Sequence, residues 1–244
     1  MNSQKFALVF LVFFLCLKAQ SQMFYSLELG STTQSLNDQR IPGKGGTKIS
    51  LTDFGKGPFT SYRAYLGYRW DRHEVRALYA PFAIKLDGQL KSATTFKNSI
   101  FQPATPTEAY YQFNSYRLTY SYALEKSGQW DYRVGFTGKI RDAEVKLTQG
   151  NLSESKKNVG FVPLLNFQAH RPLGELYSFR LDLDALGAPQ GRAIDLGLFI
   201  ERKLSIPETQ IFIGYRTVEG GADNDTVYNF AWLHTVTLGL MGQF

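Results

Sequence analysis

The stretch FAWLHTVTLGLMGQF, residues 230–244, alternates between large apolar side chains and small or polar ones, and it stops on an aromatic residue. Only a β-strand places every second side chain on the same face. A terminal strand that lacks charged residues is an exposed edge unless another strand covers it. The stretch therefore predicts a β-structure in which the last strand has a neighbour on both sides, as in a closed barrel where it pairs with the first.

The same alternation recurs along the chain, as in residues 61–70, 132–140 and 177–185. In each segment one face carries aliphatic and aromatic side chains, and the other carries charged residues and glycine. This pattern fits a soluble sandwich with its polar face outside and a membrane barrel with its polar face inside. Other features must distinguish the two.

The connections between the expected strands make that distinction. Every second connection is short, and the longest connections, 33–58 and 85–109, fall only in the other set. Short turns at one rim and longer loops at the other are typical of an outer-membrane barrel with both termini on the short-turn side. We predict an all-β, closed antiparallel transmembrane barrel of about ten strands, with eight strands or a soluble lipocalin-like barrel as alternatives. The expected strands are 23–32, 59–70, 74–84, 110–124, 130–147, 158–170, 176–186, 193–204, 210–218 and 228–244.

Residues 1–22 have the pattern of a secretory signal peptide. Lys5 precedes the apolar stretch 6–17, and small residues follow it. Because the bulky Leu15 precedes Cys16, we expect cleavage of this segment and no lipid attachment. The predicted mature domain is the barrel, residues 23–244.

Removal of that segment leaves a chain without cysteine, which must depend on packing and hydrogen bonds for its stability. The net charge falls from +6 to about +4 because Lys5 and Lys18 are lost. The remaining charge is dispersed, so we expect no nucleic-acid partner and no cofactor, and a monomer. The basic loops 43–48 and 91–99 are expected to meet outer-membrane lipids and the phosphates of lipopolysaccharide.

Three stretches are similar to a recurring group of small outer-membrane barrels of Gram-negative bacteria: RALYAPF (76–82), VGFTGKIRDAEVKL (134–147) and GGADNDTVYNFAWLH (220–234). The resemblance covers nearly all of the mature chain. It implies the barrel fold and the outer membrane, with both termini in the periplasm, and no established activity. Phe244 resembles the terminal aromatic residue that the barrel assembly machinery reads as a signal.

The polar face of each expected strand points into the lumen and carries charges of both signs. We predict that these charges form an ion-pair network that mostly plugs the barrel, with a narrow path for small solutes as the alternative. The expected network comprises Arg63, Arg69, Glu74, Arg76, Arg117, Arg133, Arg180, Asp182, Asp184, Asp195, Glu201 and Arg216, and the same parity places Asp131, Lys139 and Lys203 inside.

A tight turn over Pro189 and Gln190 would place Asp184 directly opposite Asp195, near the outer mouth. Two facing carboxylates must share a proton, bind a cation or lie beside an arginine. The candidate arginines are Arg141, Arg192 and Arg216. Paired carboxylates can also activate water, so catalysis by Asp184 and Asp195 in an outer-rim hydrolase is a third functional hypothesis.

The three histidines, His73, His170 and His234, are not expected to reach that pair. His234 faces outward on the last strand, where a lipid-modifying hydrolase would require a serine that this strand does not supply. We therefore expect a local bulge or a side chain that reaches the membrane interface.

Glu219, Asp223 and Asp225 are weak candidate ligands for a divalent cation, because their spacing does not match a calcium loop. A structural or surface-binding role is the leading functional prediction.

Overall fold

The computed structural model describes residues 22–189 and 191–244. The predicted signal peptide lies outside these residues, except for Gln22, where the first strand begins. The described residues include no helix that is long and apolar enough to cross a membrane. Apart from the short 3-10 helix η1 (Leu51–Asp53), the elements are the strands β1 (Gln22–Arg40), β2 (Ile49–Ser50), β3 (Phe59–Trp70), β4 (His73–Ala80), β5 (Ala83–Gln89), β6 (Thr94–Phe96), β7 (Ser99–Phe101), β8 (Pro106–Ala123), β9 (Asp131–Gln149), β10 (Leu152–Pro172), β11 (Tyr177–Ala188), β12 (Gly191–Lys203), β13 (Thr209–Asp223) and β14 (Tyr228–Gln243).

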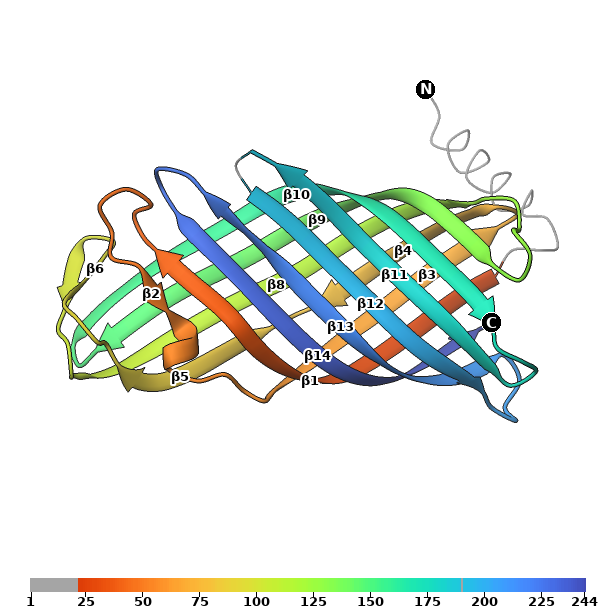
Figure 1. The fold of residues 1–244 in the computed structure, drawn as a ribbon, viewed down its shortest axis with the longest axis horizontal. Coiled ribbons are helices and arrows are strands. Elements are labelled where there is room, and N and C mark those ends of the chain that lie inside the picture. The colour runs from red at the N-terminus through yellow and green to blue at the C-terminus, as the bar shows by residue number, and fades with distance from the viewer. Residues whose placement is uncertain (1–21, 190) are drawn as a thin grey trace, which may run out of the picture.

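The strands form one antiparallel sheet that closes into a barrel when β14 pairs with β1 (Figure 1). Strands β4 and β5 follow each other along β8 and occupy one position in the wall, and β2 is a short addition beside β1. The wall thus has ten strands, which confirms the predicted number and shows that the eight-stranded alternative is wrong. Residue Phe244 is held by backbone hydrogen bonds to Met23, so the last strand has no free edge there.

Several strands continue further than predicted at the long-loop end of the barrel. The first strand reaches Arg40 instead of residue 32, and the segment 150–158, expected to be a loop, is a tight turn at Gly150 followed by β10. The expected strand 74–84 is divided at Pro81, because proline cannot donate to the ladder. The prediction assumed that a strand carries its apolar residues outward, which does not hold in this part of the barrel.

Over most of the wall the apolar side chains face outward and the charged ones inward. The alternative of a soluble barrel with an apolar interior is therefore wrong. The outward face is an apolar band that surrounds the barrel, and its most exposed members include Leu27, Leu29, Leu118, Phe136, Phe161, Leu165, Val236 and Leu238.

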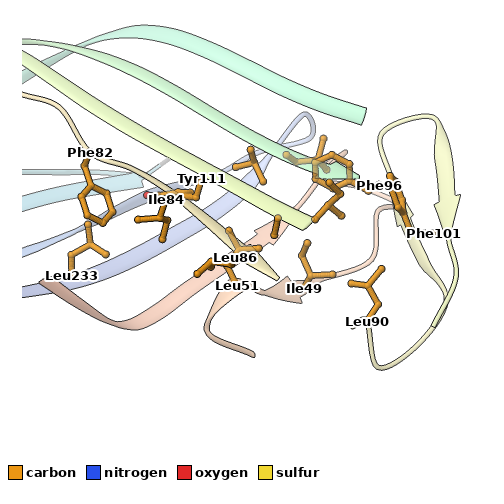
Figure 2. Packing of buried hydrophobic residues seen from close by; sticks show 14 residues of the cluster. Ile49, Leu51, Phe82, Ile84, Leu86, Leu90, Phe96, Phe101, Tyr111 and Leu233 are labelled. Carbon is orange, nitrogen blue, oxygen red and sulfur yellow. The ribbon is translucent and has the colours of Figure 1, made fainter. Parts of the chain in front are cut away.

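At the long-loop end the barrel continues beyond this band as a region that we call the extension. It consists of the distal parts of β1, β5, β8 and β9 together with β2, η1, β6 and β7. Figure 2 shows its apolar core, in which side chains from these elements pack inside the wall. The fully buried members include Leu51, Phe96, Phe101 and Leu147. The extension therefore has the opposite polarity to the rest of the barrel.

Candidate functional site

The middle of the lumen is crossed by a layer of buried charged side chains that we call the ion-pair belt. Its members come from strands on all sides of the barrel, and their side chains are at most 13% exposed. Such groups are stable in a low-dielectric interior only when they are paired and hydrogen-bonded. The belt consists of Glu28, Arg63, Arg76, Arg117, Asp182, Asp184, Asp195 and Arg216.

The two facing aspartates lie buried at the centre of this belt, and the prediction that they lie near the outer mouth is wrong. Asp184 pairs with Asp195 across β11 and β12, as expected from the turn. One guanidinium joins them, because Arg117 donates to Asp184 at 2.8 Å and to Asp195 at 2.6 Å. Asp195 also accepts hydrogen bonds from Arg216 at 2.6 Å and from Arg63 at 3.1 Å.

The remaining oxygen of Asp184 accepts hydrogen bonds from Thr137 at 2.7 Å and from Asn166 at 2.8 Å. Every oxygen of the two carboxylates therefore accepts at least one hydrogen bond. Of the three arginines suggested by the sequence, only Arg216 reaches the pair. The other two lie elsewhere: Arg192 pairs with Glu219, and Arg141 donates to Asn158.

The prediction from the alternation pattern included Arg117 among the lumen charges, but it did not pair Arg117 with the aspartates. The reason is that β8 lies across the barrel from β11 and β12, so that the contact depends on barrel closure and on side-chain length. Glu28 was missed entirely, although it alternates with Leu27 and Leu29 on the first strand and pairs with Arg216 at 3.2 Å. The parity rule applied to β1 would have found it.

A second set of charges lies toward the short-turn end. Arg69 pairs with Glu74 at 2.6 Å, Arg133 lies 3.8 Å from Glu74, and Arg180 pairs with Glu201. These five groups line a cavity of about 540 Å³, the short-turn cavity. Of the other residues placed inside by parity, Asp131 also lines this cavity, whereas Lys203 is exposed at the end of β12.

A second cavity, the long-loop cavity, has a volume of about 390 Å³ and lies on the opposite side of the belt. Arg117, Asp184 and Asp195 form part of its lining, with Lys139 beside them. No described residue lines both the long-loop cavity and the short-turn cavity, because the belt lies between them. Arg117, Asp184 and Asp195 thus lie at the base of the long-loop cavity. Its apolar lining residues include Tyr111, Phe113, Val145, Leu164, Leu186 and Val218.

The three weak metal candidates do not converge. Glu219 pairs with Arg192, Asp223 with Arg40 at 3.8 Å and Asp225 with Lys44 at 2.8 Å. Among residues 22–189 and 191–244, no group of three or more His, Cys, Asp or Glu side chains is arranged to hold a metal ion. The basic loops are likewise paired with carboxylates, as in Lys44 with Asp225, Lys48 with Asp38, Lys91 with Asp53 and Lys97 with Glu154.

On the outer surface of the barrel, His234 has polar partners that the sequence did not suggest. Its Nε2 lies 2.8 Å from the Ser35 hydroxyl, and its Nδ1 lies 2.6 Å from the Tyr215 hydroxyl. Ser35 is the extra residue where the β1–β14 register shifts between Gln34 and Leu36. The bulge expected near His234 therefore exists, but on the neighbouring strand, and it supplies the serine that β14 lacks.

Several solved outer-membrane structures match the chain at low sequence identity. The outer membrane protease OmpT from Escherichia coli aligns with a TM-score of 0.56 and 11% identity, covering 91% of this chain and 97% of that one. The fold is that of an outer-membrane β-barrel. The translocator domain of the autotransporter NalP from Neisseria meningitidis (TM-score 0.44, 10% identity, 99% and 96% covered) and an outer membrane channel from Pseudomonas putida F1 (0.44, 10%, 92% and 95%) are less similar. No protein-family model and no curated protein sequence matches the chain.

At this identity the likeness establishes the fold alone. It assigns no activity to this chain. Function must be argued from the belt, the two cavities and the His234 group.

Proposed function

We propose that the protein is an integral outer-membrane barrel with a blocked lumen, whose long-loop cavity binds a ligand at the cell surface. The observation that supports this proposal is the ion-pair belt, in which Arg117, Asp184 and Asp195 are joined at the base of the long-loop cavity. A cavity with a closed base suits binding, whereas a channel requires a continuous path. Its volume lies in the range of roughly 300–1,000 Å³ that is usual for small-molecule sites.

The proposed orientation places the short-turn end and both ends of the barrel domain in the periplasm, as is usual for outer-membrane barrels. The extension then projects from the cell. Its exposed pairs, such as Lys44 with Asp225, could exchange their carboxylates for phosphates of lipopolysaccharide. Monomer formation and recognition of Phe244 by the assembly machinery belong to the same proposal.

Conductance in planar lipid bilayers tests the blocked lumen. The wild-type protein should show no steady conductance, whereas the double variant Arg117→Ser, Arg216→Ser should conduct because it removes two guanidinium groups from the belt. A heat-dependent shift in gel migration checks that both proteins are folded. Steady conductance of the wild type would exclude the blocked lumen and favour the solute channel.

A second candidate function is hydrolysis of membrane esters by Ser35 and His234. Nucleophile and base lie within hydrogen-bond distance, and the Tyr215 hydroxyl holds the other ring nitrogen, which is the arrangement of an activated serine. The Ser35 oxygen would attack the ester carbonyl while His234 accepts its proton and passes it to the leaving alcohol. Water would then release the acyl group from Ser35 by the same steps.

This second candidate predicts labelling of Ser35 by a fluorophosphonate and release of fatty acid from phospholipid vesicles. The variant Ser35→Ala should lose both signals. The matched control is Ser31→Ala, an exposed serine on the same strand. Equal activity of the two variants would exclude Ser35 as the nucleophile.

A further inference from the structure

The wall of the barrel is incomplete between β10 and β11. Their pairing runs from Pro172 opposite Ser178 to Leu165 opposite Ala185 and ends there. Beyond Leu165, β10 continues to Leu152, but it pairs only with β9. Toward the long-loop end, the edge of β10 beyond Leu165 therefore faces a gap where β11 is no longer paired with it.

Proline explains why the ladder stops at this point. If the register continued by two residues, Pro163 would lie opposite Gly187. Because Pro163 still pairs with Gly138 in the ladder to β9, its nitrogen must face the other side, toward β11. It has no hydrogen to donate, and a β-carbon at Gly187 would find no atom within 4 Å.

The gap lies in the apolar band, at the edge of the band nearest the extension. Phe161 and Leu165, the outward residues on either side of Pro163, are 71% and 66% exposed. An open strand edge within hydrocarbon is costly unless it lines a cavity. The long-loop cavity does reach this edge, because its lining includes the outward residues Phe161 and Pro163 as well as the inward Leu164 and Leu186.

Inside the cavity, one buried lysine has no anionic partner among the described residues. Lys139 is 3% exposed, and among the described residues its ammonium has no hydrogen bond or ion pair, only the ring of Phe113 at 4.5 Å. The three carboxylates of the lining, Asp184, Asp195 and Glu219, already pair with arginines.

Arg141, two residues along β9, also lines the cavity and has no carboxylate partner within the described residues. Its Nε makes no hydrogen bond in the structure, and its only partner is the neutral side chain of Asn158. An uncompensated buried charge is costly. The cavity therefore combines two basic side chains, the buried Lys139 and the partly buried Arg141, that lack a carboxylate partner among the described residues, with an apolar exit toward the membrane.

We propose that the long-loop cavity takes up a single-chain anionic amphiphile, with its headgroup against Lys139 and Arg141 and its chain passing through the gap between residues 161–164 and 186–188. This inference deepens the proposed function and rests on it. The carboxylate or phosphate supplies the missing counter-charge, and the chain covers the free edge of β10. Exchange with the membrane then occurs sideways, without passage through the belt.

The test uses the whole barrel in phosphatidylcholine vesicles with the fluorescent fatty acid cis-parinaric acid as the probe. We expect saturable binding that Lys139→Met weakens about tenfold or more, since a charge-assisted contact is lost. The matched variant Lys139→Arg keeps the charge and should keep most of the affinity. The methyl ester of the probe, which lacks the anionic head, should bind the wild type no better than Lys139→Met binds the acid.

Closing the gap provides a second test that does not depend on the folding of a Lys139 variant. A short reversible bis-thiosulfonate cross-linker joining Pro163→Cys to Gly187→Cys should abolish exchange of the probe, and reduction should restore it. The control joins Leu165→Cys to Ala185→Cys, which are already paired. Displacement of the probe by palmitate or by lysophosphatidate identifies the headgroup as carboxylate or phosphate.

Binding that is unaffected by Lys139→Met and by the cross-link would overturn this inference, as would displacement by neither competitor. Either result leaves the blocked lumen intact if the wild type does not conduct. Conversely, steady conductance refutes the blocked lumen whatever the probe does. The two experiments thus distinguish failure of the ligand assignment from failure of the proposed function.

Discussion

The ion-pair belt and the apolar core of the extension fill the same barrel in opposite ways, and β9 passes through both. Its odd-numbered residues face inward along its whole length. In the belt region the inward residue is Lys139, whereas in the extension it is Val145 or Leu147, both buried. The outward side changes in the opposite sense, from the exposed Phe136 and Ile140 to Asp142, Glu144 and Lys146.

This reversal shows that the strand keeps its geometry and that the surroundings determine which residues it carries. Where lipid surrounds the wall, apolar side chains face outward and the interior must absorb the polar ones. Where water surrounds it, the interior becomes apolar, as in a soluble sheet protein. The inversion on β9 lies between Ile140 and Asp142 and marks the edge of the apolar band.

The largest effect is expected from Arg117→Met in the belt. This change leaves Asp184 without an ion-pair partner and removes one of three from Asp195. Breaking a buried pair by removing one member costs about 3–5 kcal/mol, because the remaining charge stays buried. Urea unfolding in vesicles, followed by gel migration, should show this loss of unfolding free energy.

The compensating variant for that experiment is Arg117→Met combined with Asp184→Asn. It removes the unpaired charge at position 184 and should recover part of the loss, since Thr137 keeps its hydrogen bond with Thr119 and Arg216 keeps its pair with Asp195. If Arg117→Met alone is as stable as the wild type, the belt does not contribute to stability and serves only to close the lumen.

Much of the belt could be predicted because the period of two assigns each charged residue to a face without further information. The register of β11 and β12 followed from one tight turn, which is why Asp184 and Asp195 were correctly placed opposite each other. Their partners could not be predicted in the same way. The contact with Arg117 crosses the lumen, and its distance depends on barrel diameter and side-chain conformation.

The second effect, in the extension, is expected from Phe101→Ala. Phe101 is fully buried and packs edge-on against Phe96 at 6.2 Å between ring centroids. Such a truncation costs about 3–5 kcal/mol in a packed core. Here the loss should remain local, because the β6–β7 hairpin forms a separate sheet. Amide exchange should rise in residues 91–105 and remain slow in the belt strands; faster exchange throughout would show that the two regions unfold together.

A matched pair on the outward face of β9 tests the position of the reversal. Phe136→Lys places a charge in the apolar band and should cost roughly 2–4 kcal/mol if lipid surrounds that position. Thr148→Lys places the same charge on the same face in the extension and should change stability by less than about 0.5 kcal/mol. Equal costs for the two variants, measured by urea unfolding in vesicles, would mean that the band does not end between them.

The alternation pattern did not predict the extension or the bulge at Ser35, and the physical reason is the same for both. Both depart from the assumption that a strand keeps one polarity and one parity. In the extension the polarity changes sides, so the strands were cut short. The first strand was ended at residue 32, before Ser35, and the extra residue there shifts the pairing with β14 from Gln34–Leu233 to Leu36–Trp232. The alternation in a sequence reveals a period of two. It does not reveal whether lipid or water surrounds the strand, or where a bulge inserts a residue.

The smallest effect is expected from Lys48→Met, which removes the ion pair to Asp38 at 2.6 Å on the surface of the extension. Lys48 is about half exposed, so the loss should be about 0.2–1 kcal/mol. Its hydrogen bond to Asp38 raises the pKa of Lys48 above 10.5, with smaller contributions from Tyr228. The stabilisation is therefore complete below pH 10.5 and is lost as the pH rises through the higher pKa of the folded state.

Salt gives the sharpest contrast between this pair and the belt. Raising the ionic strength from about 0.1 M to 1 M shortens the screening length from about 10 Å to 3 Å. The small cost of Lys48→Met should then disappear, because the lysine side chain is half exposed to solvent. The cost of Arg117→Met should persist if the lumen is blocked as proposed, because its side chain is only 3% exposed. If salt abolishes both costs equally, water and ions reach the belt, and the lumen is not blocked.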